Sequence, residues 1–162
     1  MSVKTIILDW AGTTVDFGCM APVQAFKGAF ENKGINLSYE EIRKPMGMLK
    51  LDHIKQLLAL ETVKQQWLEQ FGEASNEAAA LSIYQDFEKY LFADLAEHSH
   101  LKPETKQAIR KIKQLGFNIG TTTGYTQEMM AVVAETAKIE GYHPDYLVTP
   151  DEVGSLGRPY PY

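Results

Sequence analysis

One stretch near the start of the chain, Thr5–Thr14 (TIILDWAGTT), restricts the possible folds most strongly. Its short apolar run, Thr5–Leu8, is bounded by turn residues and predicts a strand that is buried on both faces of a sheet. The run ends at an acid, Asp9, and a turn of small residues follows. Because ligands bind beyond the carboxyl ends of the strands in an open parallel sheet, we expect Asp9 at a binding edge.

The chemistry expected of Asp9 follows from the loop behind it. A turn of small residues offers free backbone N–H groups, and such a loop can hold a phosphoryl group. This pairing favours a carboxylate nucleophile directed at phosphorus. An aspartate that only begins a turn after a strand is an equally good interpretation when Asp9 is taken alone.

The segment from about residue 20 to residue 97 has the pattern of a helical region. Ser38 with Glu41 forms a capping box, and Asn76 is placed to cap a long helix. Apolar residues recur at helical spacing, and glycine or proline ends several of the runs. The positions behind this prediction are Val23, Phe26, Ala29, Phe30, Gly34, Pro45, Ile54, Leu57, Val63, Trp67, Phe71, Gly72, Leu81, Tyr84, Phe87, Leu91 and Leu95.

After Pro103 the pattern changes to strands that alternate with helices, which predicts an α/β fold with a parallel sheet. The sequence therefore predicts a core of residues 1–19 and 98–162, split by a helical insert of residues 20–97. The signals after Pro103 are a helix through Ala108, Ile109, Ile112 and Leu115 that ends at Gly116, strands over 117–122 and 146–148, and a helix from the cap Thr126 to Gly141.

Composition excludes several classes of protein. The formal net charge of -5 and the lack of a basic block argue against nucleic acid as a partner. The single cysteine, Cys19, cannot form an intramolecular disulfide and fits a reducing, cytoplasmic setting. We see no signal-peptide pattern and no membrane-spanning run, so we expect no membrane partner. Three strands make a thin sheet, and we expect that the chain lacks a C-terminal part.

Three polar residues are expected to share one edge of the sheet. Asp9, Thr123 and Thr149 each come just after a predicted strand, so they meet if the strands are adjacent. Thr123 could donate a hydrogen bond to a phosphoryl oxygen. Taken alone, Thr123 is better interpreted as a polar strand end, and its coincidence with Asp9 favours the functional interpretation.

Lys50 is the candidate amine of the helical insert. Met46, His53 and Ile54 lie three or four residues from it and are expected on the same helical face. An apolar face with an imidazole would lower the pKa of Lys50, and a neutral amine can form a Schiff base with a carbonyl. By pattern alone a solvated lysine is favoured. His53, Met46, Cys19 and Arg158 have equally ordinary interpretations as packing or surface residues.

These residues resemble the haloacid dehalogenase superfamily, whose first three motifs match Asp9–Thr14, Thr123 and Arg158. The resemblance implies a Rossmann-like parallel-sheet core with a helical cap inserted after the first motif. More narrowly, the chain is similar from end to end to the phosphonoacetaldehyde hydrolases (phosphonatases). The segments that carry this likeness are 9–16 (DWAGTTVD), 43–47 (RKPMG), Lys50, 52–53 (DH), 122–126 (TTGYT) and 157–161 (GRPYP).

The resemblance implies a mechanism for phosphonate degradation. Lys50 would condense with phosphonoacetaldehyde to give an imine, and Asp9 would attack phosphorus to give an aspartyl phosphate. Cleavage of the C–P bond would leave an enamine, and hydrolysis would release phosphate and acetaldehyde. His53 would transfer a proton or activate the amine, and Thr123 and Arg158 would complete the catalytic set. Substrate would also contact Ala11, Gly12, Thr13, Cys19, Met46, Gly47, Gly124 and Tyr125.

The resemblance also implies Mg²⁺ and a homodimer. In the family, Mg²⁺ is held by the nucleophile, here Asp9, by the carbonyl two residues on, here Ala11, and by a later aspartate that follows the Arg158 motif and is absent from this sequence. Asp151 and Glu152 precede that motif and do not match the later aspartate. Dimerisation is expected through the cap helices.

Ala11 separates this chain from most phosphatases of the superfamily, which carry an acid at that position to protonate a leaving oxygen. A carbon leaving group needs no such acid when an iminium accepts the electrons, so Ala11 and Lys50 support one interpretation. Two alternatives stay open. One is a capped phosphatase or phosphomutase, and the other is a truncated, inactive relative that acts in binding or dimerisation through its long helix.

Overall fold

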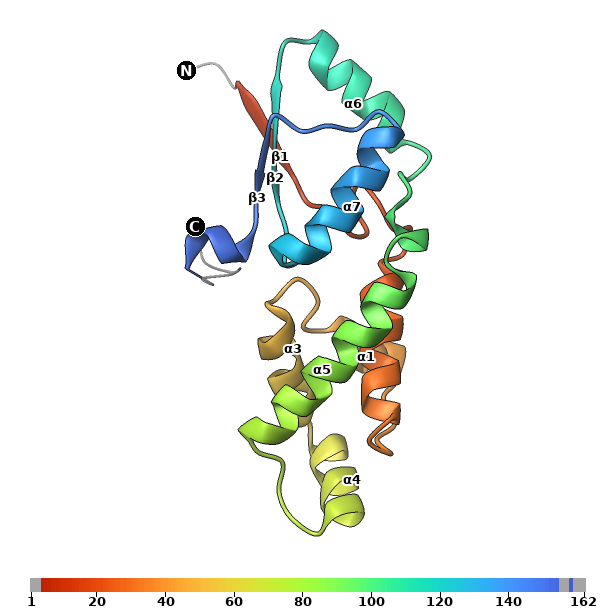
Figure 1. Ribbon diagram of the computed structural model, residues 1–162, viewed down its shortest axis with the longest axis vertical. Helices are drawn as coiled ribbons and strands as arrows, with labels where there is room; N and C mark the ends of the chain where they lie inside the picture. The colour runs from red at the N-terminus through yellow and green to blue at the C-terminus, as the bar shows by residue number, and fades with distance from the viewer. Residues whose placement is uncertain (1–3, 155–157, 159–162) are drawn as a thin grey trace. The chain divides into compact units, whose positions relative to one another are not determined.

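The computed structural model describes residues 4–154 and Arg158 (Figure 1). Gly157 and residues 159–161 of the predicted C-terminal motif lie outside the described residues. The strands are β1 (Thr5–Leu8), β2 (Asn118–Thr122) and β3 (Tyr146–Val148). The helices are α1 (Met20–Glu31), α2 (Tyr39–Arg43), α3 (Lys50–Leu58), α4 (Glu61–Phe71), α5 (Glu77–Asp94), α6 (Thr105–Gln114) and α7 (Gln127–Ile139), with short 3-10 turns at Glu97–Ser99 and Pro150–Val153.

The chain divides into two compact units. The first, which we call the sheet unit, comprises Met1–Met20 and Asp94–Tyr162, and the second, the helical unit, comprises Ala21–Ala93. The three strands form a parallel sheet in the order β1-β2-β3, as the alternating pattern predicts. Within the sheet unit, α6 and α7 lie on the same side of the strands (Figure 1).

The prediction that β1 is buried on both faces is wrong in this structure. Ile7 is 69% exposed, and its neighbours in register, Gly120 on β2 and Tyr146 on β3, share that face of the sheet. Tyr146 is 59% exposed as well, so the described residues leave this face largely uncovered. Ile119, on the opposite face, is fully buried because α6 and α7 cover that side.

The helical unit buries an aromatic and aliphatic core, and its local signals are confirmed. The Ser38–Glu41 capping box is present, and the Asn76 side chain accepts a hydrogen bond from the Ala79 N–H at 3.0 Å. The C-cap of α4 is Gly72 in the left-handed conformation (φ 74°). The largest fully buried side chains of this unit are Phe26, Phe30, Ile35, Ile42, Ile54, Leu57, Ile83, Phe87 and Leu91.

Several residues assigned to buried helical faces are exposed, among them Leu81, Ala108 and Leu115. Leu81 is 46% exposed because the buried face of α5 runs through Ala80, Ile83 and Phe87 instead. Leu115 is 64% exposed because α6 ends at Gln114 and the chain turns at Gly116, whose φ is +79°. Among the described residues, every helix is too short or too polar to cross a membrane.

Candidate active site

The three polar residues that follow the strands lie at one edge of the sheet. Asp9 follows β1, Thr123 follows β2 and Thr149 follows β3, and the strands are parallel and adjacent. Thr149 is already used as a cap, because its hydroxyl and its N–H both donate to the Glu152 carboxylate, at 3.2 and 2.7 Å. The edge therefore leaves Asp9 and Thr123 for ligand chemistry.

Asp9 is paired with the predicted Arg158. The distance between Arg158 Nη1 and Asp9 Oδ1 is 3.2 Å, and both side chains are about one-third exposed, at 31% and 35%. The Arg158 Nε atom is buried and has no hydrogen-bond partner among the described residues. A guanidinium next to a carboxylate presents further N–H donors to an anion.

The loop behind Asp9 is not rich in free N–H groups, and that prediction is wrong. The Trp10 carbonyl accepts hydrogen bonds from the N–H groups of Thr13 and Thr14, at 2.9 and 2.8 Å, and the Gly12 N–H donates to the Val15 carbonyl at 2.8 Å. The turn closes on itself and uses its own donors. The N–H groups of Gly12, Thr13 and Thr14 are therefore already used within the turn.

Thr123 supplies a side-chain hydroxyl. It is 6% exposed, and its hydroxyl oxygen accepts a hydrogen bond from the Tyr125 N–H at 3.0 Å, across Gly124. A threonine hydroxyl that accepts one bond still has its own hydrogen to donate. Tyr125 is 2% exposed, and burial, followed by the nearby Cys19, Asp16 and Asp9, raises its pKa well above its ordinary value. Tyr125 is therefore a neutral hydroxyl at physiological pH.

Cys19 is half-buried and lies in a constrained turn before α1. Cys19 and Asp16 both have positive φ angles, 55° and 53°, which are unusual for residues other than glycine. A Cβ on Gly12 would lie 3.2 Å from the Cys19 Cβ, so the turn packs closely against the loop that follows Asp9.

Asp16, the last residue of the motif 9–16, is not among the predicted site residues. It is 5% exposed, and its Oδ1 accepts from the Met20 N–H at 2.8 Å and lies 3.6 Å from His98 Nδ1. Its bond to the first N–H of α1 comes from four residues before the helix, a position that the usual N-cap pattern does not cover.

The described residues contain no cluster of three or more His, Cys, Asp or Glu side chains that could hold a metal ion. Of the nearby acids, Asp151 accepts from the Gln127 N–H and Glu152 caps Thr149. The two oxygens that the resemblance predicts as metal ligands are those of the Asp9 carboxylate and the Ala11 carbonyl. Mg²⁺ is commonly bound by one or two carboxylates, waters and substrate phosphate, so these two oxygens fit part of such a site.

Lys50 is buried, and the interpretation of it as a solvated lysine is wrong. It is the first residue of α3 and is 6% exposed, with its Nζ 6.0 Å from the centroid of the Phe26 ring. An aromatic face attracts a cation, whereas burial penalises one. Phe26 lies 24 residues earlier in the chain, so no pattern around Lys50 could reveal this contact.

His53 lies one turn further along α3 and is fully buried. Its Nε2 lies 2.8 Å from the Ile42 carbonyl oxygen, which can only accept, so Nε2 carries the hydrogen. Nδ1 is then an acceptor, and it has no hydrogen-bond partner among the described residues. Burial, with a smaller contribution from the charge of Lys50, lowers the pKa of His53 to about 3.

Met46 does not share a helical face with Lys50, so this expectation is wrong. Met46 and Gly47 belong to the turn between α2 and α3, and α3 begins only at Lys50. Gly47 has a φ of +100°, a conformation open to glycine, and it interrupts the helical path. Both residues are half-buried and precede Lys50 in the sequence by three or four positions.

Comparison with known proteins places this geometry in a family. Residues 3–162 match the sequence model of the haloacid dehalogenase-like hydrolases. The chain is 44% identical over 162 residues to the phosphonoacetaldehyde hydrolases of Bacillus cytotoxicus and Bacillus cereus, which covers 100% of this chain and 61% of each relative. The chain therefore spans about three-fifths of the length of these relatives.

Solved structures give the same grouping. The crystal structure of a phosphonoacetaldehyde hydrolase-like protein from Oleispira antarctica matches with a TM-score of 0.92 and 40% identity, over 98% of this chain and 57% of that one. A predicted phosphoglycolate phosphatase from Haemophilus somnus matches with a TM-score of 0.65 and 14% identity, over 98% of this chain and 65% of that one. The second likeness shows the fold alone.

Proposed function

This chain belongs to the haloacid dehalogenase-like hydrolases, and we propose that it carries the nucleophile and the amine of a phosphonoacetaldehyde hydrolase. The reaction would split the C–P bond of phosphonoacetaldehyde into acetaldehyde and phosphate. The observation that carries the proposal is the buried Lys50, because a lysine with no chemical task is normally solvated. The 44% identity to hydrolases of that name supports it.

In this proposal Lys50 activates the substrate carbon. The amine attacks the aldehyde, water leaves, and an imine forms. The attacking amine is the Lys50 Nζ, which is buried 6.0 Å from the centroid of the Phe26 ring. Nε2 of His53 is committed to the Ile42 carbonyl, so Nδ1 is the ring nitrogen through which His53 would act on the amine.

Asp9 acts on phosphorus. One carboxylate oxygen forms a bond to phosphorus as the C–P bond breaks, and the electron pair of that bond moves into the iminium to give an enamine. Arg158, 3.2 Å from Asp9, and the Thr123 hydroxyl are placed at the same edge to stabilise charge on the phosphoryl oxygens. Water then releases phosphate from Asp9, and hydrolysis of the imine after protonation of the enamine frees acetaldehyde and Lys50.

Ala11 agrees with this division of roles. An oxygen leaving group needs a general acid, and the methyl side chain of Ala11 cannot supply one. With the iminium as the electron acceptor, the departing carbon needs no proton at the moment of cleavage. A phosphatase that hydrolyses sugar phosphates would lack its acid at this position.

Mg²⁺ would be held by the Asp9 carboxylate and the Ala11 carbonyl oxygen, with its remaining ligands outside the described protein groups. When bound, it would offset the negative charge of the phosphoryl group. The other groups proposed to contact substrate are Gly12, Thr13, Cys19, Met46, Gly47, Gly124 and Tyr125.

The helical unit, Ala21–Ala93, is proposed to act as the cap over the substrate, close to the interval 20–97 that the sequence predicts. The proposed reaction requires the Lys50 amine and the Asp9 carboxylate to act on the same substrate molecule. A homodimer formed through cap helices and a cytoplasmic location complete the proposal.

The test is reductive trapping of the imine. Sodium borohydride added with phosphonoacetaldehyde should leave a stable adduct, and peptide mapping should place it on Lys50. Lys50→Arg should abolish the adduct, whereas Lys55→Arg, an exposed lysine of the same helix that is paired with Glu77, should retain it. Hydrolysis of sugar phosphates without any adduct from phosphonoacetaldehyde would overturn the proposal.

A further inference from the structure

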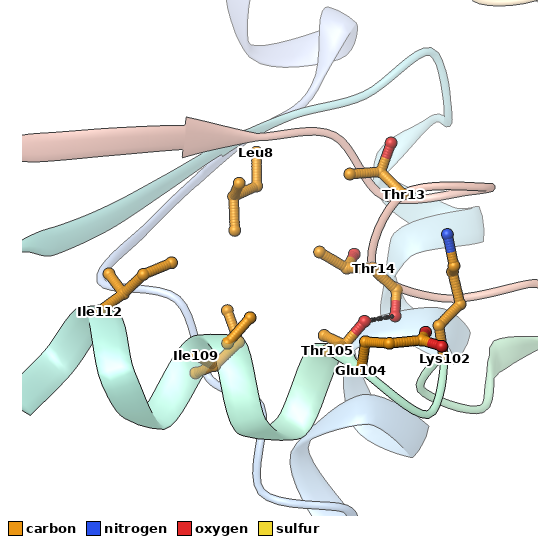
Figure 2. A pocket seen from close by; sticks show the side chains of 9 residues that line it. Leu8, Thr13, Thr14, Lys102, Glu104, Thr105, Ile109 and Ile112 are labelled. Carbon is orange, nitrogen blue, oxygen red and sulfur yellow. Dashed lines mark hydrogen bonds between the residues drawn. The ribbon is translucent and has the colours of Figure 1, made fainter.

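A segment far along the chain holds the loop that follows Asp9. The backbone N–H of Lys102 donates to the Thr14 carbonyl at 3.0 Å, and the Thr105 hydroxyl donates to the same carbonyl at 2.8 Å. The Lys102 ammonium donates to the Gly12 carbonyl at 2.9 Å, between residues 90 positions apart. Figure 2 shows Lys102 and Thr105 beside Thr13 and Thr14, with the Thr105 bond dashed.

Thr14 is in turn hydrogen-bonded to Asp9. The Thr14 hydroxyl donates to the backbone carbonyl of Asp9 at 3.1 Å, and Thr14 is 3% exposed. A buried residue with its carbonyl fixed from one side and its hydroxyl bonded on the other has little freedom to move. The backbone from which the Asp9 side chain projects is thereby tied to residues 102–105.

Lys102 differs from the other contacts because it brings a charge. Its ammonium contacts the carbonyl of Gly12, which has a φ of +79° and closes the turn. A charged donor binds a carbonyl more strongly than a neutral one does. The Lys102 side chain also lines a cavity of about 180 Å³ with Leu8, Ile109 and Ile112, and its Nζ lies 5.9 Å from the centroid of the Phe17 ring. These neighbours restrict the path of the side chain.

We propose that Lys102 is a positioning residue for Asp9, an inference that rests on the proposed function. Its ammonium fixes the Gly12 peptide, and so sets the direction in which the Asp9 carboxylate leaves the end of β1. Thr105 and the backbone of Lys102 already tether Thr14. Loss of the ammonium should therefore cost little stability and should mainly impair the alignment of Asp9 with phosphorus.

The test compares Lys102→Met, which keeps the apolar stem, with Lys111→Met, an exposed lysine of α6. In the protein supplied with Mg²⁺ and phosphonoacetaldehyde, Lys102→Met should lower kcat for phosphate release about 10-fold and change KM less than twofold. Lys111→Met should leave both unchanged. Lys102→Arg keeps a charged donor and should recover kcat to within about threefold of the original.

Two further readouts separate this inference from the proposed function. Borohydride trapping on Lys50 should be equal in Lys102→Met and the unmodified protein, since the amine does not depend on the loop. The ¹³C resonance of the Gly12 carbonyl should move in Lys102→Met and stay in place in Lys111→Met, and this measurement needs no turnover.

The possible failures are distinct. If the unmodified protein forms no adduct, the proposed function fails, and the Gly12 resonance still decides whether Lys102 holds the turn. The positioning role is overturned if kcat for Lys102→Met stays within twofold of that for Lys111→Met. It is overturned as well if the Gly12 carbonyl resonance does not respond.

Discussion

Lys50 and Asp9 lie in opposite surroundings. Lys50, in the helical unit, is 6% exposed, with an aromatic ring and a fully buried histidine nearby. Asp9, in the sheet unit, is about one-third exposed, with the Arg158 guanidinium 3.2 Å away. The amine therefore lies in an apolar interior, whereas the carboxylate lies at a half-open edge beside a cation.

In the proposed reaction these two groups are the nucleophiles, one directed at a carbonyl and the other at phosphorus. An amine attacks a carbonyl only when it is neutral, and a carboxylate attacks phosphorus only when it is ionised. His53, one turn from Lys50 on α3, is kept uncharged, because burial lowers its pKa. Substitutions that change the environment of Asp9 or of Lys50, but not both, test whether the two groups act separately.

The largest effect should come from Asp9→Asn. Phosphate release should fall about 10⁴-fold or more, because an amide cannot replace the carboxylate nucleophile. Borohydride trapping on Lys50 should persist, since imine formation needs only the amine half. Phosphate release and peptide mapping of the adduct provide the two measurements. Loss of the adduct in Asp9→Asn would show that imine formation at Lys50 depends on Asp9.

Arg158→Met should have the next largest effect. Removal of the guanidinium beside Asp9 should lower kcat about 10²- to 10³-fold, a loss typical of one preorganised donor. Arg158→Lys should recover only part of the rate, because an ammonium lacks the planar pair of donors. The matched control is Arg110→Met, an exposed arginine of α6. Equal rates for the Arg158 and Arg110 variants would show that Arg158 has no role in the reaction.

Sequence reasoning succeeded where the signal is local. The Ser38–Glu41 box, the Asn76 cap and the turn at Gly72 each depend on residues within four positions of one another. The strands and their parallel order also follow from short apolar runs and their alternation with helices. Such features are set by backbone geometry, so they can be predicted before any packing is known.

Sequence reasoning failed where a distant partner decides. Ile7 and Leu81 are apolar yet exposed, because burial depends on what packs over them. Lys50 is buried by contacts with residues such as Phe26. The general tendency of lysines to be solvated does not predict these contacts. The ammonium of Lys102 reaches Gly12 across 90 positions. The prediction of free N–H groups after Asp9 failed for a different reason, because the N–H groups of Gly12, Thr13 and Thr14 are bonded within the turn itself.

A smaller effect is expected from pH acting on His53. Its pKa is about 3 in the folded protein, against an ordinary value of 6.5, so the unfolded chain binds the proton more readily. The stabilisation is therefore fully present above pH 6.5 and is lost as the pH falls towards 3. Between pH 7 and pH 5 it should weaken by about 2 kcal/mol, from 1.36 kcal/mol per pKa unit.

The measurement is urea unfolding at pH 7 and pH 5 for His53→Gln and for His143→Gln, an exposed histidine. Glutamine can still donate to the Ile42 carbonyl but does not titrate in this range. His53→Gln should show a smaller loss of unfolding free energy on acidification, whereas His143→Gln should behave as the unmodified protein does. Identical pH dependence in the two variants would mean that His53 is not held neutral by the fold.

The smallest effect should come from Asn76→Ala, which removes the cap of α5 without touching either reactive group. The Ala79 N–H would lose its 3.0 Å partner, and the free energy of unfolding should fall by about 1 kcal/mol. Asn76→Ser should retain most of the stability, because serine caps nearly as well. Urea unfolding gives the stability, and the rate of borohydride trapping should stay constant in both variants. A slower trapping rate in Asn76→Ala would show that the surroundings of Lys50 depend on the end of α5, and that the amine is prepared by the whole helical unit rather than by its nearest neighbours.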